Sequence, residues 1–413
     1  MAFDVIIWTI YLVSLYYGVF WFLVYLDHGA EEEKKSRKDF PLVTIAIPAH
    51  NEVKTVIATI KSVLDLDYPK DKLEVLVVNN GSKDNTSQIT NDFIKTVNYN
   101  IRLIDLPNPG KGAAMNYAIK QAKGEFFVTL DADSYVKSDA LKVILPYFDN
   151  DEVASVLPII KVRQKNSLMR KMQSVEYLLN FFYKKLISCL DCVHVTPGPF
   201  SVYRKSILTK IGGFDENNLT EDQEIAIRLQ KYNYKILQIL GTEVTTDAPK
   251  NYISFYKQRN RWYKGSLLNL WKHRDLMFNK KYGEFGMFHL PAVLTVATIA
   301  IIYSTYILYN YAIKPISNYL YDMSFINFNV SFIISEAVEK FSFLDLNYMT
   351  MFFGLSVMFV SLIAIRLAFK YTNEKLSSTL FATSLYLILY PTLLSITWLG
   401  VAFDLLRGKK QRW

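Results

Sequence analysis

The hydrophobic residues of this chain form two kinds of pattern: long apolar runs toward its ends and short runs between them. Each long run is sufficient to cross a hydrocarbon core of about 30 Å. The long runs are Val5–Leu26, Leu290–Tyr309, Met349–Leu367 and Ser378–Phe403. The first lacks the basic start and small-residue cleavage site of a signal peptide, so we expect a retained anchor. A water-exposed domain should lie between this anchor and a C-terminal membrane cluster.

In the central region, short β-branched runs alternate with stretches in which apolar residues recur at helical spacing. The runs that predict strands are Val43–Ile47, Val75–Val78, Ile101–Asp105 and the residues from Phe127, and we expect the first strand to stop at Pro48. The stretches that predict helices are Glu52–Leu64, Asn85–Thr96 and Ala113–Ala122. Strands that alternate with helices of this length predict βαβ units, a mostly parallel sheet and an α/β fold.

Beyond Asp139 the alternation is weaker. We expect a strand at Val153–Val162 and helices at Leu168–Leu186, Thr220–Gln230 and Tyr252–His273. Thr220 followed by Gln223 predicts a capping box, in which the threonine hydroxyl accepts a backbone N–H of the first turn. The last helix is dense in Tyr, Trp, Arg and Lys, a composition that suits the surface of a bilayer.

The net charge of +9 favours a membrane partner over a nucleic acid, which we do not expect as a partner. Anionic lipid and a phosphate-bearing substrate explain the basic residues, which gather beside the apolar runs and in the central region. The loop Tyr311–Asn347 holds two lysines and no arginine. Under the positive-inside rule this loop lies outside and the central domain lies in the cytoplasm. We therefore expect a multi-pass protein of the plasma membrane.

The basic tail Arg407–Arg412 conflicts with that topology, because four spans that start outside also finish outside. Basic residues are expected on the cytoplasmic side. Two alternatives remain open: a re-entrant or broken segment around Pro391, and a further buried helix around Phe332.

Four polar groups follow the predicted strands of the first half. They are Pro48–Glu52, Asn79–Asp84, Lys111–Gly112 and Asp131–Asp133. Ligands of open α/β sheets bind beyond the carboxyl ends of the strands, so we expect these groups to share one rim. Two acids one residue apart at such a rim suit a divalent cation that holds a diphosphate. Taken alone, Asp131 and Asp133 also fit an ordinary helix cap.

These motifs, in this order, resemble the family-two inverting glycosyltransferases with a GT-A fold. The matching elements are I-P-A-H-N-E at 47–52, N-N-G-S-K-D-N-T at 79–86, D-A-D at 131–133, T-E-D at 220–222 and Q-R-N-R-W at 258–262. More narrowly, the chain is similar to the membrane-embedded synthases of cellulose, chitin, hyaluronan and poly-N-acetylglucosamine. The resemblance covers roughly Leu42 to Gly265, and the Q-x-x-R-W element is its most specific part.

The resemblance implies a GT-A nucleotide-sugar-binding domain inserted between membrane helices. The expected divisions are an N-terminal transmembrane helix (1–27), a charged linker (28–40), a cytoplasmic glycosyltransferase domain (41–250), interfacial amphipathic helices that carry Q-x-x-R-W (251–285) and a C-terminal transmembrane region (286–413). The last division should hold about three spans and the outside loop 311–347.

On the donor side, the resemblance implies that Asp133 ligates Mg²⁺ or Mn²⁺, which offsets the charge of a leaving diphosphate. The residues implied to bind the nucleotide-sugar are Pro48, Glu52, Asn80, Lys111, Asp131 and Arg261. The planar fork of Arg261 suits a diphosphate. Its alternative role is contact with lipid headgroups, and the alternative for Lys111 is a solvated loop lysine.

On the acceptor side, the resemblance implies that Asp222 is the general base, which takes the proton of the attacking hydroxyl. Acids in the first turn of a helix also stabilise its dipole, a role that Glu221 and Glu224 fill equally well. The residues implied to contact the acceptor are Gly198, Glu221, Gln258 and Trp262. Trp262 would offer a flat face to a sugar ring.

The second strand departs from the family pattern. Relatives usually carry one or two aspartates before Gly-Ser, and one of these acids reads the base of the nucleotide. Here both positions are asparagine, Asn79 and Asn80. An amide can still pair with a uracil edge, because it both donates and accepts hydrogen bonds. The sequence therefore identifies the fold more firmly than it identifies the nucleotide of the donor sugar.

The resemblance implies an enzyme that moves a sugar from a UDP-sugar to a growing β-linked polysaccharide and couples this transfer to export. Its partners would be a nucleotide-sugar donor, a glycan or lipid-linked acceptor and membrane lipid. A second copy of the chain or an export partner would complete the path, since the C-terminal spans are few. Two alternatives remain open: a polyprenyl-phosphate sugar transferase that adds a single sugar, and a non-catalytic nucleotide-sugar-binding subunit.

Overall fold

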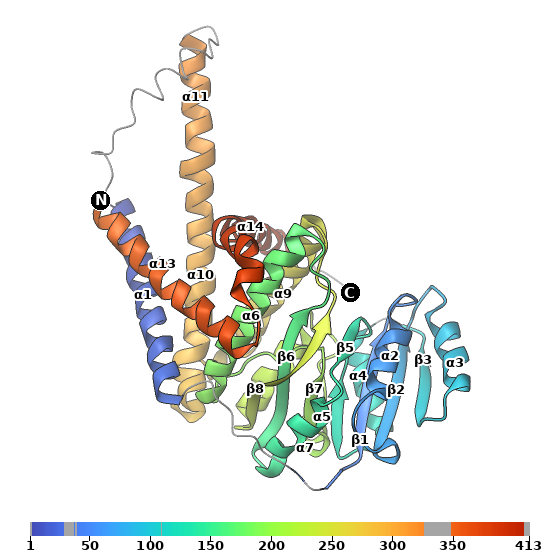
Figure 1. The fold of residues 1–413 in the computed structure, drawn as a ribbon. Coiled ribbons are helices and arrows are strands. Elements are labelled where there is room, and N and C mark those ends of the chain that lie inside the picture. Colours follow the sequence, from blue (N-terminus) through green and yellow to red (C-terminus); the bar gives the residue numbers. More distant parts are fainter. Residues whose placement is uncertain (1, 29–36, 38, 109, 326–347, 409–413) are drawn as a thin grey trace.

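The computed structural model describes residues 2–28, 37, 39–108, 110–325 and 348–408. An α/β domain forms one part of the molecule, and long helices stand on one side of it (Figure 1). The described strands form one eight-stranded sheet in the order β3-β2-β1-β4-β7-β6-β8-β5. Four of the seven strand pairs are parallel. The sheet is therefore mostly parallel, as the sequence predicts.

The first half of the sheet consists of βα units with strand order β3-β2-β1-β4, all parallel. Its elements are β1 (Val43–Ala49), α2 (Val56–Leu64), β2 (Leu73–Asn80), α3 (Thr86–Thr96), β3 (Ile101–Leu106), α4 (Lys111–Gln121) and β4 (Phe126–Thr129). Strands β2 and β4 are buried along their whole length. Burial of both faces explains why these strands read as continuous apolar runs in the sequence.

Strand β1 continues through Pro48 to Ala49, beyond the predicted stop. On one side its ladder with β4 ends at Ala46, whose carbonyl accepts the N–H of Leu130 at 2.9 Å. Successive residues of a strand face opposite neighbours, so Pro48 faces the same side as Ala46, where the ladder has ended. The missing N–H of proline therefore removes no bond between strands.

The second half of the sheet contains strands of both directions. Its strands are β5 (Ser134–Val136), β6 (Val153–Val162), β7 (Ser201–Arg204) and β8 (Lys235–Thr246). Strand β7 is antiparallel to β4 and β6, whereas β6 and β8 are parallel. The sequence predicts β6 at its observed bounds but misses β5, β7 and β8.

Two long helices connect the sheet with the membrane region. The helices of the second half are α5 (Ala140–Ile144), α6 (Leu168–Cys189), α7 (Lys205–Lys210), α8 (Glu221–Lys231) and α9 (Tyr252–Lys272). Helix α6 packs against β6 and β8 on one side and against α13 and α14 on the other. Helix α9 contacts both α8 and α14. Both helices therefore lie between the sheet and the apolar helices (Figure 1).

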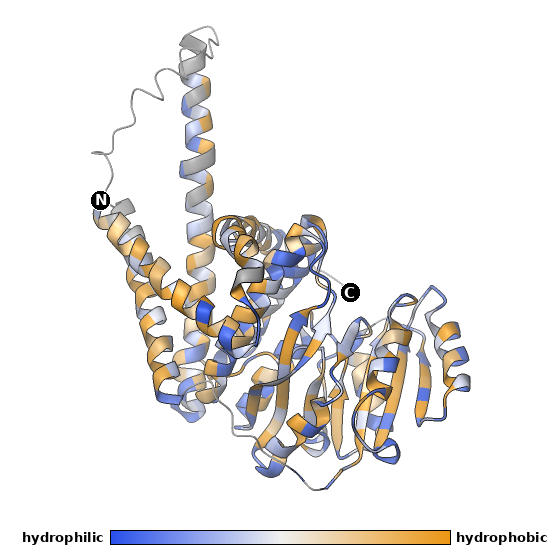
Figure 2. Ribbon diagram, viewed as in Figure 1, coloured by the Kyte–Doolittle hydropathy of each residue, from blue (hydrophilic) through white to orange (hydrophobic). Residues whose placement is uncertain are grey.

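Most of the remaining helices are predominantly apolar, as their colouring in Figure 2 shows, whereas Lys314–Phe325 mixes polar and apolar residues. They are α1 (Ala2–His28), α10 (Leu290–Leu308), α11 (Lys314–Phe325), α13 (Tyr348–Tyr371) and α14 (Leu380–Leu406). Within the described ranges, three helical stretches are long and apolar enough to cross a membrane: Phe285–Tyr306, Met351–Tyr371 and Leu380–Leu406. The N-terminal span, in α1, stays a prediction.

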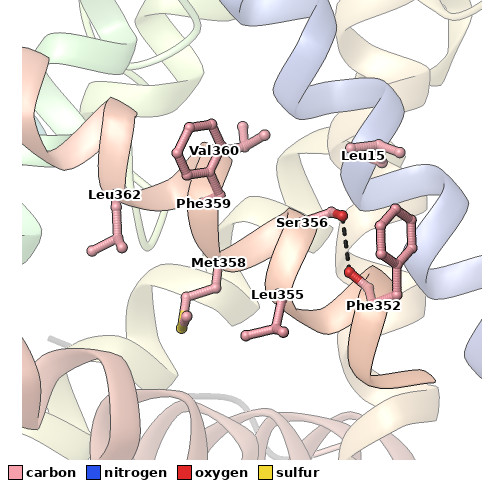
Figure 3. Close-up of a pocket in the computed structure, with 8 residues that line it drawn as sticks. All are labelled: Leu15, Phe352, Leu355, Ser356, Met358, Phe359, Val360 and Leu362. Carbon is pink, nitrogen blue, oxygen red and sulfur yellow. Dashed lines mark hydrogen bonds between the residues drawn. The ribbon is translucent and has the colours of Figure 1, made fainter. Parts of the chain in front are cut away.

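Helices α1 and α13 lie side by side, with the ring centroids of Trp8 and Phe353 5.0 Å apart. Gly18 of α1 permits close approach, because a Cβ there would stand 2.7 Å from Val360. Beside this contact an apolar groove of about 500 Å³ is lined by Leu15 and by one face of α13 (Figure 3). The lining carries no charged residue, which fits a surface that faces lipid chains.

Helix α14 runs unbroken through Pro391. The predicted break at this proline is therefore wrong. Both halves of α14 contact the α/β domain. Ala382 shares an apolar cluster with Val175 of α6. Near the other end, Trp398 stacks on Tyr263 of α9 with ring centroids 4.4 Å apart.

Four expectations fall outside the described residues. They concern most of the linker 28–40, the centre of the loop 311–347, the segment around Phe332 and the tail from residue 409. These expectations stay predictions.

Candidate active site

The predicted polar groups lie at the carboxyl ends of neighbouring strands. In β1 the penultimate residue, Pro48, pairs with Val78, and the last, Ala49, pairs with Asn79. In β3, Asp105 pairs with Asn79 from the other side. Strand β4 ends just before Asp131. The ends of four parallel strands thus form the rim that the sequence predicts for a ligand.

Lys111 is the centre of a charged cluster at this rim. Its Nζ donates to Asp131 Oδ1 at 2.5 Å and lies 3.6 Å from Glu221 Oε1. Burial disfavours an ammonium charge, but the two carboxylates outweigh it and raise the pKa of Lys111. The cluster joins the start of α4, the turn after β4 and the start of α8 around one positive charge.

Glu221 and Asp222 open α8, where the helix dipole favours negative charge. Burial raises the pKa of Glu221 to about 7, with Lys111 opposing that change. Burial also raises the pKa of Asp222, while Lys111 and Arg261 act to lower it. Arg261 of α9 therefore faces the same cluster. Burial thus favours the neutral form of both carboxyl groups, and carboxyl groups with shifted pKa values in one cluster mark a candidate site of proton transfer.

Asp133 lies in a second group of acids beside the first. Burial raises the pKa of Asp133 to about 7, and the nearby Asp131 and Glu52 add to this effect. The Ser134 hydroxyl donates to Asp133 at 3.1 Å, and the Thr55 hydroxyl donates to Glu52 at 2.5 Å. In the described part of the chain, no three His, Cys, Asp or Glu side chains are already arranged around a metal position.

The two asparagines that replace the family's acids hold neighbouring loops. Asn80 Oδ1 accepts the N–H of Gly110 at 2.9 Å, which fixes the loop before Lys111. Asn79 Nδ2 donates to Asp105 Oδ1 at 2.6 Å. The rim therefore still carries an acid near this position, supplied by β3 and not by β2.

Gly198 leaves no room for a side chain beside the charged cluster. A Cβ there would stand 2.5 Å from Asp131 Oδ2 and 2.5 Å from Lys111 Nζ. Two residues earlier, the N–H and the hydroxyl of Thr196 donate to the carbonyl of Asp222 at 3.1 and 2.9 Å. Gly198, predicted on the acceptor side, thus contacts residues predicted on the donor side.

The residues of Q-x-x-R-W divide between two places. Arg261 faces Asp222, whereas Gln258 and Trp262 contact Arg259. Arg259 Nη1 donates to Gln258 Oε1 at 2.7 Å, and its guanidinium lies 4.2 Å from the Trp262 ring. Arg259 is 1% exposed, and its Nη2 donates to Glu176 of α6 at 2.5 Å. The motif therefore also fastens α9 to α6.

The predicted capping box at Thr220 is wrong. The Thr220 hydroxyl accepts Asn269 Nδ2 of α9 at 3.0 Å. The N–H of Gln223 is instead accepted by Asp222 Oδ1 at 2.9 Å. Gly265 brings α9 against Thr220, because a Cβ at that position would overlap the threonine side chain. A tertiary contact thus replaces the local cap.

Sequence reasoning missed three polar residues: Glu176 and His289, which are buried, and His194, which is half-buried. Glu176 had a signal, since an acid is unusual in the aromatic stretch of α6. The two histidines had none, because their hydrogen bond of 2.7 Å joins residues 95 positions apart.

Comparison with known proteins finds glycosyltransferases. The model of glycosyl transferase family 2 matches residues 44–212. Poly-beta-1,6-N-acetyl-D-glucosamine synthase of Staphylococcus epidermidis is 30% identical over 328 residues, which are 75% of this chain and 78% of that protein. Probable glycosyltransferase YdaM of Bacillus subtilis is 28% identical over 63% of this chain and 64% of its own. A solved mannosyltransferase of Pyrobaculum calidifontis, in complex with GDP-Man and Mn²⁺, covers 99% of both chains at 17% identity with a TM-score of 0.65, a likeness of fold.

Proposed function

The chain belongs to glycosyl transferase family 2, and from that premise we propose the reaction that it catalyses and the residues that carry it. The family, the enzyme class and the GT-A-like α/β fold predicted from the sequence are confirmed. We propose that the enzyme transfers a sugar, with inversion, from a UDP-sugar to a growing β-linked polysaccharide at the membrane, and that transfer is coupled to export.

One observation carries this proposal: Lys111 joins Asp131 at the sheet rim to Glu221, the neighbour of Asp222. Lys111 and Arg261 would hold the diphosphate of the donor, where negative charge grows as the bond to the sugar breaks. Asp222 would take the proton of the acceptor hydroxyl while that oxygen attacks the anomeric carbon. Lys111 would then lie between the donor diphosphate and the general base.

We propose Asp133 as the ligand of a divalent cation, Mg²⁺ or Mn²⁺, with Asp131 in its shell. Asp131 and Glu52 act with burial to raise the pKa of the half-buried Asp133, although the described side chains are not gathered around one metal position. Such a set of hard oxygen donors suits a divalent cation, which relieves the repulsion. The cation would supply positive charge to the leaving diphosphate. Pro48, Glu52 and Asn80 would line the rest of the nucleotide-sugar site.

The acceptor would approach from the membrane side, past Trp262, Gln258 and Gly198, with Glu221 beside the base. The name of the staphylococcal relative makes N-acetylglucosamine the first sugar to test. The sheet spans Val43 to Thr246, which supports a catalytic domain at 41–250, followed by the Q-x-x-R-W helix within 251–285. Membrane spans would occupy 1–27 and 286–413, with the catalytic domain in the cytoplasm.

The direct test uses the purified full-length protein in detergent with Mn²⁺ or Mg²⁺. It is offered labelled UDP-N-acetylglucosamine, UDP-glucose and GDP-mannose, and the product is sized. We expect polymer and free UDP from one UDP-sugar, with no turnover in EDTA. Asp222→Asn and Asp133→Ala should abolish transfer, whereas Asp275→Asn, at an exposed ion pair with Lys231, should not.

Each other outcome has a definite meaning. A lipid carrying a single sugar would replace the polymer assignment with the lipid-linked alternative. Binding of a donor without release of its nucleotide would identify a non-catalytic subunit. Near wild-type turnover of Asp222→Asn would remove that residue from the role of base.

A further inference from the structure

We propose that His289, at the start of the membrane helix α10, is a positioning residue for Asp222 and acts through His194 and the segment 193–198. The inference rests on the proposed function, in which Asp222 is the general base. It assigns a role to a residue that has no place in the donor or acceptor site. Three contacts in series carry the argument.

The first contact joins α10 to the segment. His289 ends a π-helical turn, Phe285–His289, directly before α10. Single π-helical turns in α-helices frequently accompany functional sites. His289 is 4% exposed, and its Nε2 lies 2.7 Å from His194 Nδ1. One imidazole must donate and the other accept, so the pair is a specific hydrogen bond and not a repulsion of two cations.

His194 is held in its neutral form, so the pair does not become two repelling cations. Burial, with His289 and Lys184 nearby, lowers the pKa of His194 well below its ordinary value. The contact therefore persists across the neutral pH range in which a glycosyltransferase works.

The second set of contacts fastens the segment on both sides of His194. Gln230 of α8 donates to the carbonyl of Val193 at 3.1 Å. Lys184 of α6 donates to the carbonyl of Val195 at 3.4 Å. The chain between these two points has little freedom, so a displacement of His194 moves the residues that follow it.

The third contact reaches the base. Thr196 donates both its N–H and its hydroxyl to the carbonyl of Asp222. Two residues further on, Gly198 touches the Lys111–Asp131 pair. The same segment thus meets the base and the donor cluster. Since a misplacement of about 1 Å can cost a hundredfold in rate, the anchor at α10 matters for the chemical step.

The test compares variants that break the histidine pair with variants that keep it. His289→Leu removes the partner of His194. The double variant His194→Asn/His289→Gln keeps a donor and an acceptor, because Asn reproduces the position of Nδ1 and Gln that of Nε2. Tyr371→Phe is the matched control, since it removes a 3.0 Å hydrogen bond to Tyr25 between two other membrane-region helices.

The readouts are kcat, the KM for the donor and the pH profile of kcat. For His289→Leu we expect kcat to fall about tenfold to a hundredfold and donor KM to change less, because Thr196 bonds Asp222 directly whereas Gly198 only touches the donor cluster. The acid limb of the profile should shift, since it reports Asp222 in its altered position. The double variant should regain most of kcat, and Tyr371→Phe should match the wild type.

Two results would overturn the inference: wild-type kcat in a folded His289→Leu protein, or a double variant as slow as His289→Leu. If His289→Leu does not fold, the single variant His194→Asn, which keeps the hydrogen bond, and His194→Leu, which breaks it, give the same comparison. Asp222→Asn is assayed beside them. An active Asp222→Asn would remove Asp222 from the proposed role of base, on which this inference rests, whereas an inactive one with a normal His289→Leu would refute only the positioning role.

Discussion

At the scale of single residues, Gly198 determines whether Lys111 can reach Asp131. A methyl group at this position would meet the ends of both side chains, so the contact between Lys111 and Asp131 must open. We predict that Gly198→Ala lowers the rate of transfer about tenfold to a hundredfold, because the displaced ammonium no longer faces the donor diphosphate. Steady-state kinetics with the preferred donor measures this effect.

Gly110→Ala is the control for Gly198→Ala. A Cβ at Gly110 would meet only the Cβ of Ala113, at an ordinary 3.7 Å. Both variants should unfold near the wild-type temperature, since neither requires the backbone to shift. Equal kinetics for the two alanine variants would contradict the prediction.

Glu224 supplies a prediction about pH. Burial favours its neutral form, but His273, Arg228 and Lys272 outweigh burial and lower its pKa to about 2. A carboxylate whose folded pKa lies below its unfolded value of about 4.3 stabilises the protein above that value. This stability is lost as the pH falls toward 2.

We therefore predict that Glu224→Gln is less stable than the wild type by up to about 3 kcal/mol at pH 7, and that the difference shrinks between pH 4.5 and 2. Unfolding of both proteins in the same detergent, over a series of pH values, measures it. A difference that stays constant down to pH 3 would contradict the assignment.

The rim residues were predictable because strands of one direction bring their carboxyl ends together. Asp131, Lys111 and Asp222 lie where that rule and the family pattern suggest, although their roles stay predictions. Glu176 had a signal as an acid in an aromatic stretch, but its partner was not predictable. The pairing of His194 with His289 had no signal, because these partners lie far apart in the sequence. Thr220 shows the reverse error, since a correct local signal was overridden by Asn269.

At the scale of elements, the Arg259–Glu176 pair holds α9 against α6. Both side chains are buried, at 1% and 9% exposure. Removal of one partner from a buried pair leaves an uncompensated charge and typically costs 3–5 kcal/mol, whereas replacement of both by apolar residues is often neutral. We predict that Arg259→Met destabilises the protein strongly and that Arg259→Met/Glu176→Met regains most of the loss.

Thermal unfolding of the wild type, both single variants and the double variant measures this coupling. Lys231→Met/Asp275→Asn, at a more exposed pair, provides a comparison with little expected coupling. Additive losses at Arg259 and Glu176 would contradict a specific contribution of the pair.

The elements were predictable in the first half of the domain and less so in the second. Strands β1, β2 and β4 are buried on both faces and carry a predominantly apolar signal in their centres. Strand β8 alternates buried and half-buried residues, and the exposed Gly241 interrupts its signal. Strand β7 has four residues and lacks a pattern long enough to recognise. Its pairing with β4 and β6 fixes it instead.

At the scale of the whole molecule, the contacts of α14 bear on the side of its basic tail. Ala382 and Trp398 of α14 both contact helices of the α/β domain. Gly400 also lies against the Tyr256 side chain of α9. The distance along the helix from Ala382 to Gly400 is about 27 Å, close to the thickness of a hydrocarbon core. A helix that crossed the membrane away from the domain would not meet it at both ends.

We therefore predict that α14 does not cross the membrane. It would lie along the α/β domain, and the tail would lie on the cytoplasmic side. Three crossings, by α1, α10 and α13, would then satisfy the positive-inside rule. Gln411→Cys, in a chain with both natural cysteines replaced by serine, should resist a membrane-impermeant thiol reagent in intact cells. Asn329→Cys, in the loop predicted outside, should react. Labelling of residue 411 in intact cells would place the tail outside.

The turn between α13 and α14 has a consequence for biosynthesis. Lys161 donates to the carbonyl of Thr372 at 2.9 Å, and Lys165 pairs with Glu374 at 3.3 Å. These contacts join residues 211 and 209 positions apart in the chain. During translation the lysines emerge long before their partners, so the catalytic domain must wait, with α6 uncovered, until the last helices leave the ribosome. A chain stopped after α10 would therefore expose the apolar face of the amphipathic helix α6, which quality control in the cell can recognise.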